Sequence, residues 1–198
     1  MHIPSRFATR LLLCCAVAAA PAFALAQDAA SAKPAKPAVG TAMSPSETYG
    51  KLLANMEKEF VDAADAMPED KFNFSPAATA GDFKGVRSFG EQVKHVADAN
   101  YYFFGGNMSE ADMKAKSDAI AKLTSKADII QALKDSFTQA HAYVNGITPE
   151  NVFVMTEHGT RGGMSTFGLA HMMDHYGQMV VYLRMNGIVP PASRGGGM

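Results

Sequence analysis

The sequence predicts an all-α protein: a four-helix bundle preceded by a signal peptide and a flexible linker. In four long segments, apolar residues recur at steps of three and four, which is the period of an amphipathic helix. Serine-based caps open most of these segments, and proline or glycine closes them. The strict alternation of apolar and polar residues that marks a half-buried strand does not occur.

Residues 1–26 have the pattern of a secretory signal peptide. Arg6 and Arg10 form a positive start, an apolar run follows, and Ala24-Leu25-Ala26 offers the small residues that a signal peptidase recognises. The run is too short to span a membrane, so we expect an exported, periplasmic protein with no stable membrane insertion after cleavage. Residues 27–43 are rich in Ala, Lys and Pro and are expected to form a disordered linker.

Composition restricts the partners and the chemistry. Cys14 and Cys15 are the only cysteines, so cleavage leaves no disulfide and no thiol ligand. Cleavage also removes two of the 18 basic residues, which leaves 16 against 19 acidic ones and a formal charge of −3. The chain has no run of Lys and Arg, so we expect no nucleic-acid partner. We expect one domain over residues 44–191 and a flexible tail over residues 192–198.

The first two helices of the domain have the clearest starts. Ser44-Pro45-Ser46-Glu47 is a capping box with proline at the first helical position, and Pro68 ends this helix. Residues 68–87 are expected to form an ordered loop held by aromatic side chains. A second capping box, Ser88-Phe89-Gly90-Glu91, opens a helix that runs to about Phe104 and stops at two glycines.

Two further long helices are expected to complete the bundle. The connection before them could include a short helix around residues 110–122. Ser125 caps a helix that extends to about Asn145. The last helix is expected to start at Ser165 or Thr166 and to end at Asn186-Gly187, after a flexible turn at residues 161–163. It is apolar nearly all round, so it is either central to the bundle or also the interface of a homodimer.

Three histidines form the candidate metal site. His171 and His175 are four residues apart on the last helix, so their side chains lie roughly 6 Å apart on one face. His95 lies in the second helix, and three imidazoles with one open position make a catalytic type of metal site. Neutral imidazoles suit zinc, nickel, iron or copper, and we expect zinc or nickel.

A structural interpretation stands beside the metal site. The pair at positions i and i+4 is by itself as compatible with coincidence as with metal binding. His95 falls at the edge of its apolar stripe, beside Gln92 and Ala99, which also suits a boundary histidine. For His141 and His158, a surface or hydrogen-bonded position is the preferred interpretation.

Carboxylates supply the candidates for the other roles in such a site. A metal-bound histidine needs an acceptor for its second ring nitrogen, and the neighbours in sequence are Asp174, Asp98 and Gln178. Asp174, Glu157 and Asp98 are the candidates for a general base. Spacing along the chain places none of the three.

The most specific pattern lies near the end of the chain. It reads His171-x-x-x-His175-Tyr176-Gly177-Gln178, followed by Leu183-Arg184-Met185-Asn186-Gly187 and two prolines. This pattern resembles the last helix of DinB-like (DinB/YfiT) proteins, and the resemblance covers Ser44 to Pro191. It implies a four-helix bundle with a metal bound by three histidines. His95 matches the position on the second helix, and His171 and His175 match the two on the last helix.

The resemblance also bears on activity. Many members have Arg at the position of Tyr176, and often His at that of Asp174. The family includes low-molecular-weight thiol transferases and metal-dependent hydrolases. Because an exported protein seldom meets cytosolic thiols, we favour a metal-dependent hydrolase with an unknown small-molecule substrate over a thiol-dependent transferase. A non-catalytic metal- or ligand-binding bundle is the alternative, and a bundle with a vestigial triad is a third option.

Overall fold

The computed structural model describes residues 36–195, and in this part the chain is helical apart from loops and one isolated bridge between Met155 and Thr160. The signal peptide predicted over residues 1–26 lies outside the described residues. So do residues 27–35 of the predicted linker and residues 196–198 of the predicted tail. Among the described helices, none combines the length and the apolar composition that a membrane crossing requires.

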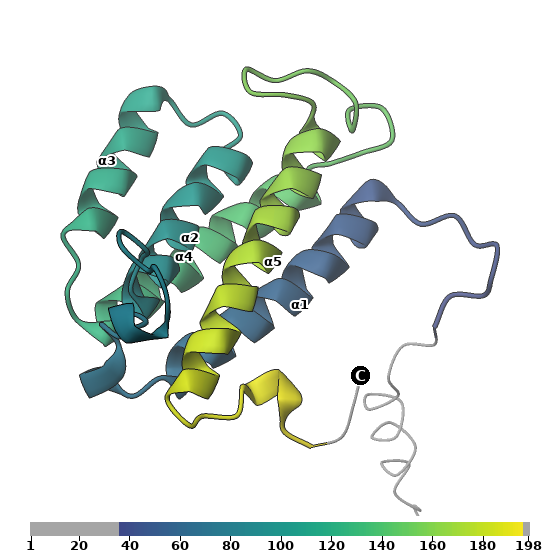
Figure 1. Ribbon diagram of the computed structural model, residues 1–198. Helices are drawn as coiled ribbons and strands as arrows, with labels where there is room; N and C mark the ends of the chain where they lie inside the picture. Colours follow the sequence, from purple (N-terminus) through teal and green to yellow (C-terminus); the bar gives the residue numbers. More distant parts are fainter. Residues whose placement is uncertain (1–35, 196–198) are drawn as a thin grey trace, which may run out of the picture. The chain divides into compact units, whose positions relative to one another are not determined.

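Four long helices form the bundle: α1 (Pro45–Ala66), α2 (Phe89–Phe104), α4 (Lys126–Asn145) and α5 (Arg161–Met185). Each of α1 and α2 packs against both α4 and α5, so the four helices enclose one core. A fifth helix, α3 (Glu110–Ala121), packs on α2 at the edge of the bundle (Figure 1). The prediction of an all-α fold is therefore confirmed, with α3 added beside the four long helices.

Serine caps begin the helices as predicted. The Ser44 side chain accepts a hydrogen bond from the Glu47 amide (3.1 Å), and the Ser88 side chain accepts one from the Glu91 amide. Ser125 caps α4 in the same way. These bonds satisfy amides that have no partner inside the helix, so they fix where each helix starts.

The predicted start of the last helix at Ser165 or Thr166 was wrong. The helix begins at Arg161, and Thr160 caps it by accepting a hydrogen bond from the Gly163 amide (3.1 Å). The two glycines do not form a flexible turn. A Cβ atom at Gly162 would lie only 2.8 Å from the Val152 side chain, so glycine at this position permits close packing.

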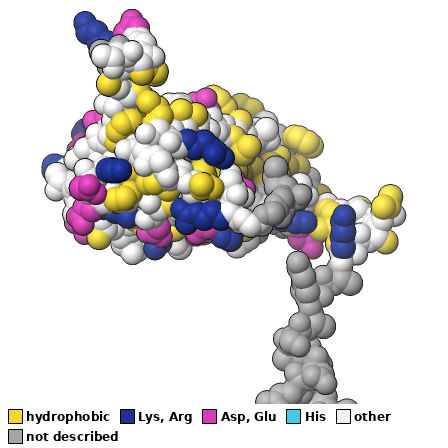
Figure 2. Space-filling view, turned by 60° about the horizontal axis from the view of Figure 1, so that its bottom comes forward, with side chains coloured by type: hydrophobic (Ala, Val, Ile, Leu, Met, Phe, Trp, Pro, Cys, Tyr) yellow, Lys and Arg dark blue, Asp and Glu magenta, His cyan; other side chains and the backbone are white. Residues whose placement is uncertain are grey.

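The α5 helix is not buried all round. Its inward face is buried and includes Met172, Met179 and Leu183. Its outward face exposes large apolar side chains, namely Phe167, Met173, Val181 and Met185. On the face shown in Figure 2, basic, acidic and apolar side chains are intermingled. Residues 192 and 193, which we assigned to the tail, belong to a short 3-10 helix (η4, Pro191–Ser193) that contacts α1.

Glycine also sets the distance between α2 and α5. A Cβ atom at Gly168 would lie 2.6 Å from Cζ of Phe104 and 3.0 Å from Cβ of Phe103. The missing side chain therefore lets α5 lie directly on the two phenylalanines of α2. His171 follows one turn later on α5, so this contact brings it toward the histidine of α2.

Two glycines of α5 give a matched test of this packing. We expect Gly168→Ala to lower the free energy of unfolding by about 1–3 kcal/mol, because the methyl group displaces buried rings. Gly177→Ala should raise it by about 0.5–1 kcal/mol, because this glycine is exposed with no neighbouring atom within 4 Å and alanine is the better helix former. Urea unfolding followed by circular dichroism measures both. A stabilising Gly168→Ala variant would contradict the packing argument.

Candidate metal centre

The structure brings the three histidines together from two helices. Nε2 of His171 on α5 lies 3.1 Å from Nε2 of His95 on α2 and 3.1 Å from Nε2 of His175. One ring nitrogen of each residue lies within 4.8 Å of the others, so the three could hold a single metal ion. The turn of helix between His171 and His175 and the close approach of α2 produce this geometry.

A chain of hydrogen bonds fixes the ring of His175. An ionised carboxylate only accepts, so the amide nitrogen of Gln178 must point to Asp174 (3.2 Å). The amide oxygen of Gln178 then accepts from Nε2 of Gln92 (2.8 Å). The amide oxygen of Gln92 is left to face Nδ1 of His175 at 2.5 Å. Nδ1 of His175 therefore carries the proton, and its Nε2 presents a lone pair to the cluster.

The cluster cannot satisfy itself with hydrogen bonds. Nε2 of His171 faces two ring nitrogens, and a single N–H group there can donate to only one of them. Nδ1 of His171 is buried and has no hydrogen-bond partner among the described residues. A cation bound by the three Nε2 lone pairs would remove the conflict.

The spacing also fits such an ion. Two nitrogens that each lie about 2.05 Å from a tetrahedral metal are about 3.3 Å apart. The Nε2 atoms of His171 and His95 are separated by 3.1 Å, and the same separation holds for His171 and His175. The three residues thus match the donor type and the spacing of a site that keeps a position open for a further ligand.

Burial keeps the three imidazoles neutral. Desolvation, together with the neighbouring His171 and His95, lowers the pKa of His175 to about 4. Desolvation likewise lowers the pKa of His95 and of His171, although Asp98 and Asp174 respectively oppose the shift. Because only a neutral imidazole can donate a lone pair, all three histidines are in the ligand form at neutral pH.

The candidate carboxylates occupy different positions. Asp98 is half-buried one turn after His95 and lines the cavity beside it. Asp174 is exposed and accepts the hydrogen bond from Gln178. Glu157 is exposed in the loop before α5. Of the three, the structure therefore brings Asp98 to the cavity next to the triad.

Sequence reasoning missed Gln92 as the partner of His175. The proposed acceptors were Asp174, Asp98 and Gln178, and two of these stand behind Gln92 in the hydrogen-bond chain. Gln92 is only 2 % exposed, although it is polar and one turn before His95. A long polar side chain within an otherwise apolar helix face was the available signal.

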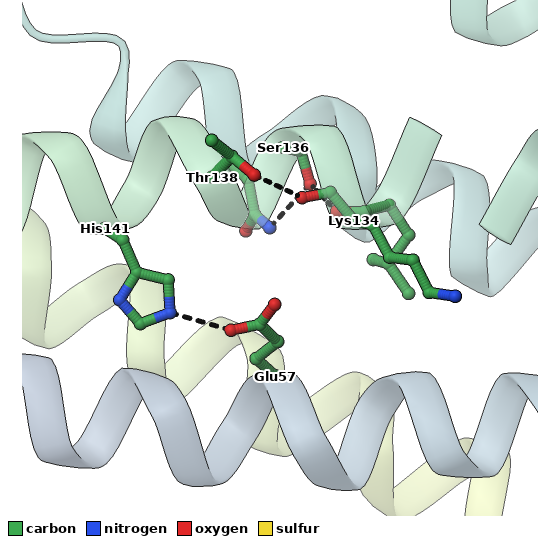
Figure 3. A network of polar contacts seen from close by, with 7 residues as sticks. Glu57, Lys134, Ser136, Thr138 and His141 are labelled. Atoms are coloured by element: carbon green, nitrogen blue, oxygen red, sulfur yellow. Dashed lines mark hydrogen bonds and ion pairs between the residues drawn. The ribbon is translucent and has the colours of Figure 1, made fainter. Parts of the chain in front are cut away.

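His141 and His158 lie outside the triad. His141 on α4 donates to the carboxylate of Glu57 on α1 across 2.7 Å (Figure 3). The ring of His158 stacks on Tyr102, with 4.9 Å between ring centroids. Both positions agree with the structural interpretation of these residues.

The metal-free protein should lose stability in mild acid. Unfolded histidine titrates near pH 6.5, whereas folded His175 titrates near 4, so the unfolded state takes up the proton first. The free energy of unfolding should be highest above pH 6.5 and fall by up to roughly 3 kcal/mol toward pH 4. Urea unfolding in the presence of a chelator measures this loss. In a His175→Leu variant the decline should be clearly smaller, and an equal decline would contradict the assignment.

The sequence that contains this site matches a known protein family. Residues 52–179 match the DinB superfamily, and the matched segment runs from α1 into α5. It contains His95, His171 and His175 together with Gln92 and Gln178. No curated protein matches the chain. Because the match spans well over half of the sequence and includes both histidine-bearing helices, the chain belongs to the DinB superfamily.

Proposed function

We propose that this protein binds one divalent metal ion through His95, His171 and His175 and acts as a metal-dependent hydrolase of a small molecule. The observation that carries the proposal is the convergence of three Nε2 atoms that cannot satisfy one another. Zinc and nickel suit three neutral imidazoles. When bound, such an ion polarises a carbonyl or phosphoryl group and makes water more acidic.

The residues around the site have three different roles in this proposal: metal ligation, orientation of a ligand and proton acceptance. The three imidazoles supply neutral nitrogen donors, which burial favours by lowering each pKa. Gln92 holds the ring of His175 with Nε2 directed inward. Asp98, in the cavity beside His95, is the carboxylate best placed to accept a proton from an attacking water.

The cavity supports an enzyme over a non-catalytic binding module. A site that only stored a metal would be closed by apolar side chains, whereas Asp98 and Ser117 line an open cavity next to His95.

We also retain two predictions from the sequence, on export and on dimerisation. Residues 1–26 favour export to the periplasm, where thiol cofactors are scarce, and the exposed apolar face of α5 supports a homodimer.

Metal content tests the binding site. We expect the purified protein to hold one zinc or nickel ion per chain, and His95→Ala and His171→Ala to lose most of it, because each removes a ligand. Gln92→Leu keeps the ligands but should bind about 10–100-fold more weakly, since the ring of His175 loses its acceptor. Mass spectrometry of metals and chelator competition measure both effects.

His141→Ala is the matched control for metal content. It removes a half-buried helical histidine whose partner is Glu57, so the metal content should stay unchanged. Equal metal content in the parent and in the His95 and His171 variants would refute the triad.

Hydrolysis tests the catalytic part of the proposal. The metal-loaded protein should cleave a generic ester, amide or phosphate, and Asp98→Asn should reduce the rate by about 10²–10⁴-fold because the proton acceptor is lost. Metal content should be unchanged in this variant. Glu157→Gln is the control and should retain activity. Full activity in Asp98→Asn would exclude Asp98 as the base, and metal binding without any turnover would favour the non-catalytic alternative.

A further inference from the structure

The cavity next to the triad has the size of a ligand site. It measures about 520 Å³ and lies between α2, α3 and residues 85–87, with His95 in its wall. Ligand-binding clefts generally enclose about 300–1,000 Å³. Val86 and Ile120 supply apolar surface. The lining also includes four charged side chains, namely Arg87, Glu91, Lys94 and Asp98.

Two of the four charges are held by the fold itself. The carboxylate of Glu91 accepts from the Ser88 amide at 2.7 Å and thereby completes the cap of α2. The ammonium of Lys94 donates to the carbonyl oxygens of Ala121 and Leu123, at 3.4 and 3.3 Å, and so anchors the end of α3. These two side chains are committed to structure and are poorly placed to recognise a ligand.

Arg87 is the cation that the fold leaves available. Its side chain is exposed and forms no ion pair or hydrogen bond within residues 36–195. Its backbone is nevertheless fixed, because the Tyr182 hydroxyl of α5 donates to the Arg87 carbonyl oxygen (3.2 Å). The guanidinium also contributes to the lowered pKa of all three triad histidines, so its charge is felt at the site.

Arg87 and Asp98 place opposite charges on the two sides of His95 in the cavity wall. Arg87 lies just before Ser88, the N-cap of α2, and His95 follows the first helical residue, Phe89, by six residues, about 9 Å along the helix axis. Asp98 follows His95 by one further turn. A guanidinium presents a planar set of donors that matches a carboxylate or a phosphate, whereas Asp98 repels an anion. Arg87 therefore favours an anionic group at its end of the cavity, where its charge also acts on the capping carboxylate of Glu91, and Asp98 disfavours one at the other end.

We infer that the cavity binds an extended, anionic substrate whose carboxylate or phosphate group is held by Arg87 while the bond to be cleaved lies at the triad. This inference rests on the proposed function, because the triad must hold a metal for the second part to apply. Ile120 and Val86 would contact the apolar body of the substrate between its two ends.

Cobalt-loaded protein provides a binding test that does not depend on turnover. Acetate and a series of linear dicarboxylates from succinate to suberate are titrated while the visible absorption of the cobalt site is recorded. In the parent protein, a dicarboxylate of matching length should bind at least tenfold more tightly than acetate, since its second carboxylate reaches Arg87. Phosphonocarboxylates of the same lengths distinguish a site for phosphate from one for carboxylate.

Two variants isolate the role of Arg87. Arg87→Gln should bind every dicarboxylate about as weakly as acetate, with acetate binding changed less than threefold. Lys84→Gln removes an equal charge from an exposed lysine of the same loop that does not line the cavity, and should keep the tenfold preference. The cobalt spectrum and the helical circular dichroism report whether each variant is folded and loaded.

The outcomes separate the two proposals. A parent protein that shows no cobalt spectrum overturns the metal site and the anion site together. A cobalt-loaded parent that prefers no dicarboxylate over acetate, or an Arg87→Gln variant that keeps the preference, overturns the anion site alone.

Discussion

The direct packing of α5 on α2 is the contact on which the site depends. At Gly168 the backbone of α5 lies against the ring of Phe104 and Cβ of Phe103, and one turn further His171 meets His95. Hydrogen bonds from Gln92 extend the same contact toward the end of α5. The imidazoles are thus positioned by two rigid helices in a packed core, which is how a protein holds ligands to within a few tenths of an ångström.

The orientation of the hydrogen bonds around His175 is set by a residue at the surface. The carboxylate of Asp174 orients Gln178, which orients Gln92, and the last amide oxygen decides which nitrogen of His175 is protonated. The result is a buried cluster of lone pairs in which Nδ1 of His171 has no hydrogen-bond partner in the described part of the chain. Such a cluster costs stability in the absence of an ion, because its polar atoms have given up water without gaining full partners. Function and stability are therefore opposed at this point of the core.

Local signals predicted the helices well, and contacts between helices were harder. The capping boxes gave correct starts because a cap depends on three neighbouring residues. The predicted start of α5 was wrong because the role of Gly162 depends on contacts outside the helix, with Tyr49 in α1, 113 residues earlier, and with Val152 in the preceding loop. Helical spacing put two histidines on one face, but the position of His95 at the edge of its stripe did not show that it faces them. Only the family pattern indicated that His95 faces the other two histidines. The spacing of residues gave no signal that pairs Gln92 with His175.

The attachment of α3 to the outside of the bundle has an evolutionary consequence. This helix packs on α2, and Ile120 is its one buried side chain among the described residues. It contributes a wall of the cavity but none of the residues that hold the histidines. Changes in α3 can therefore alter the shape of the pocket without disturbing the ligands, so one scaffold could acquire new specificities by replacing a single peripheral segment.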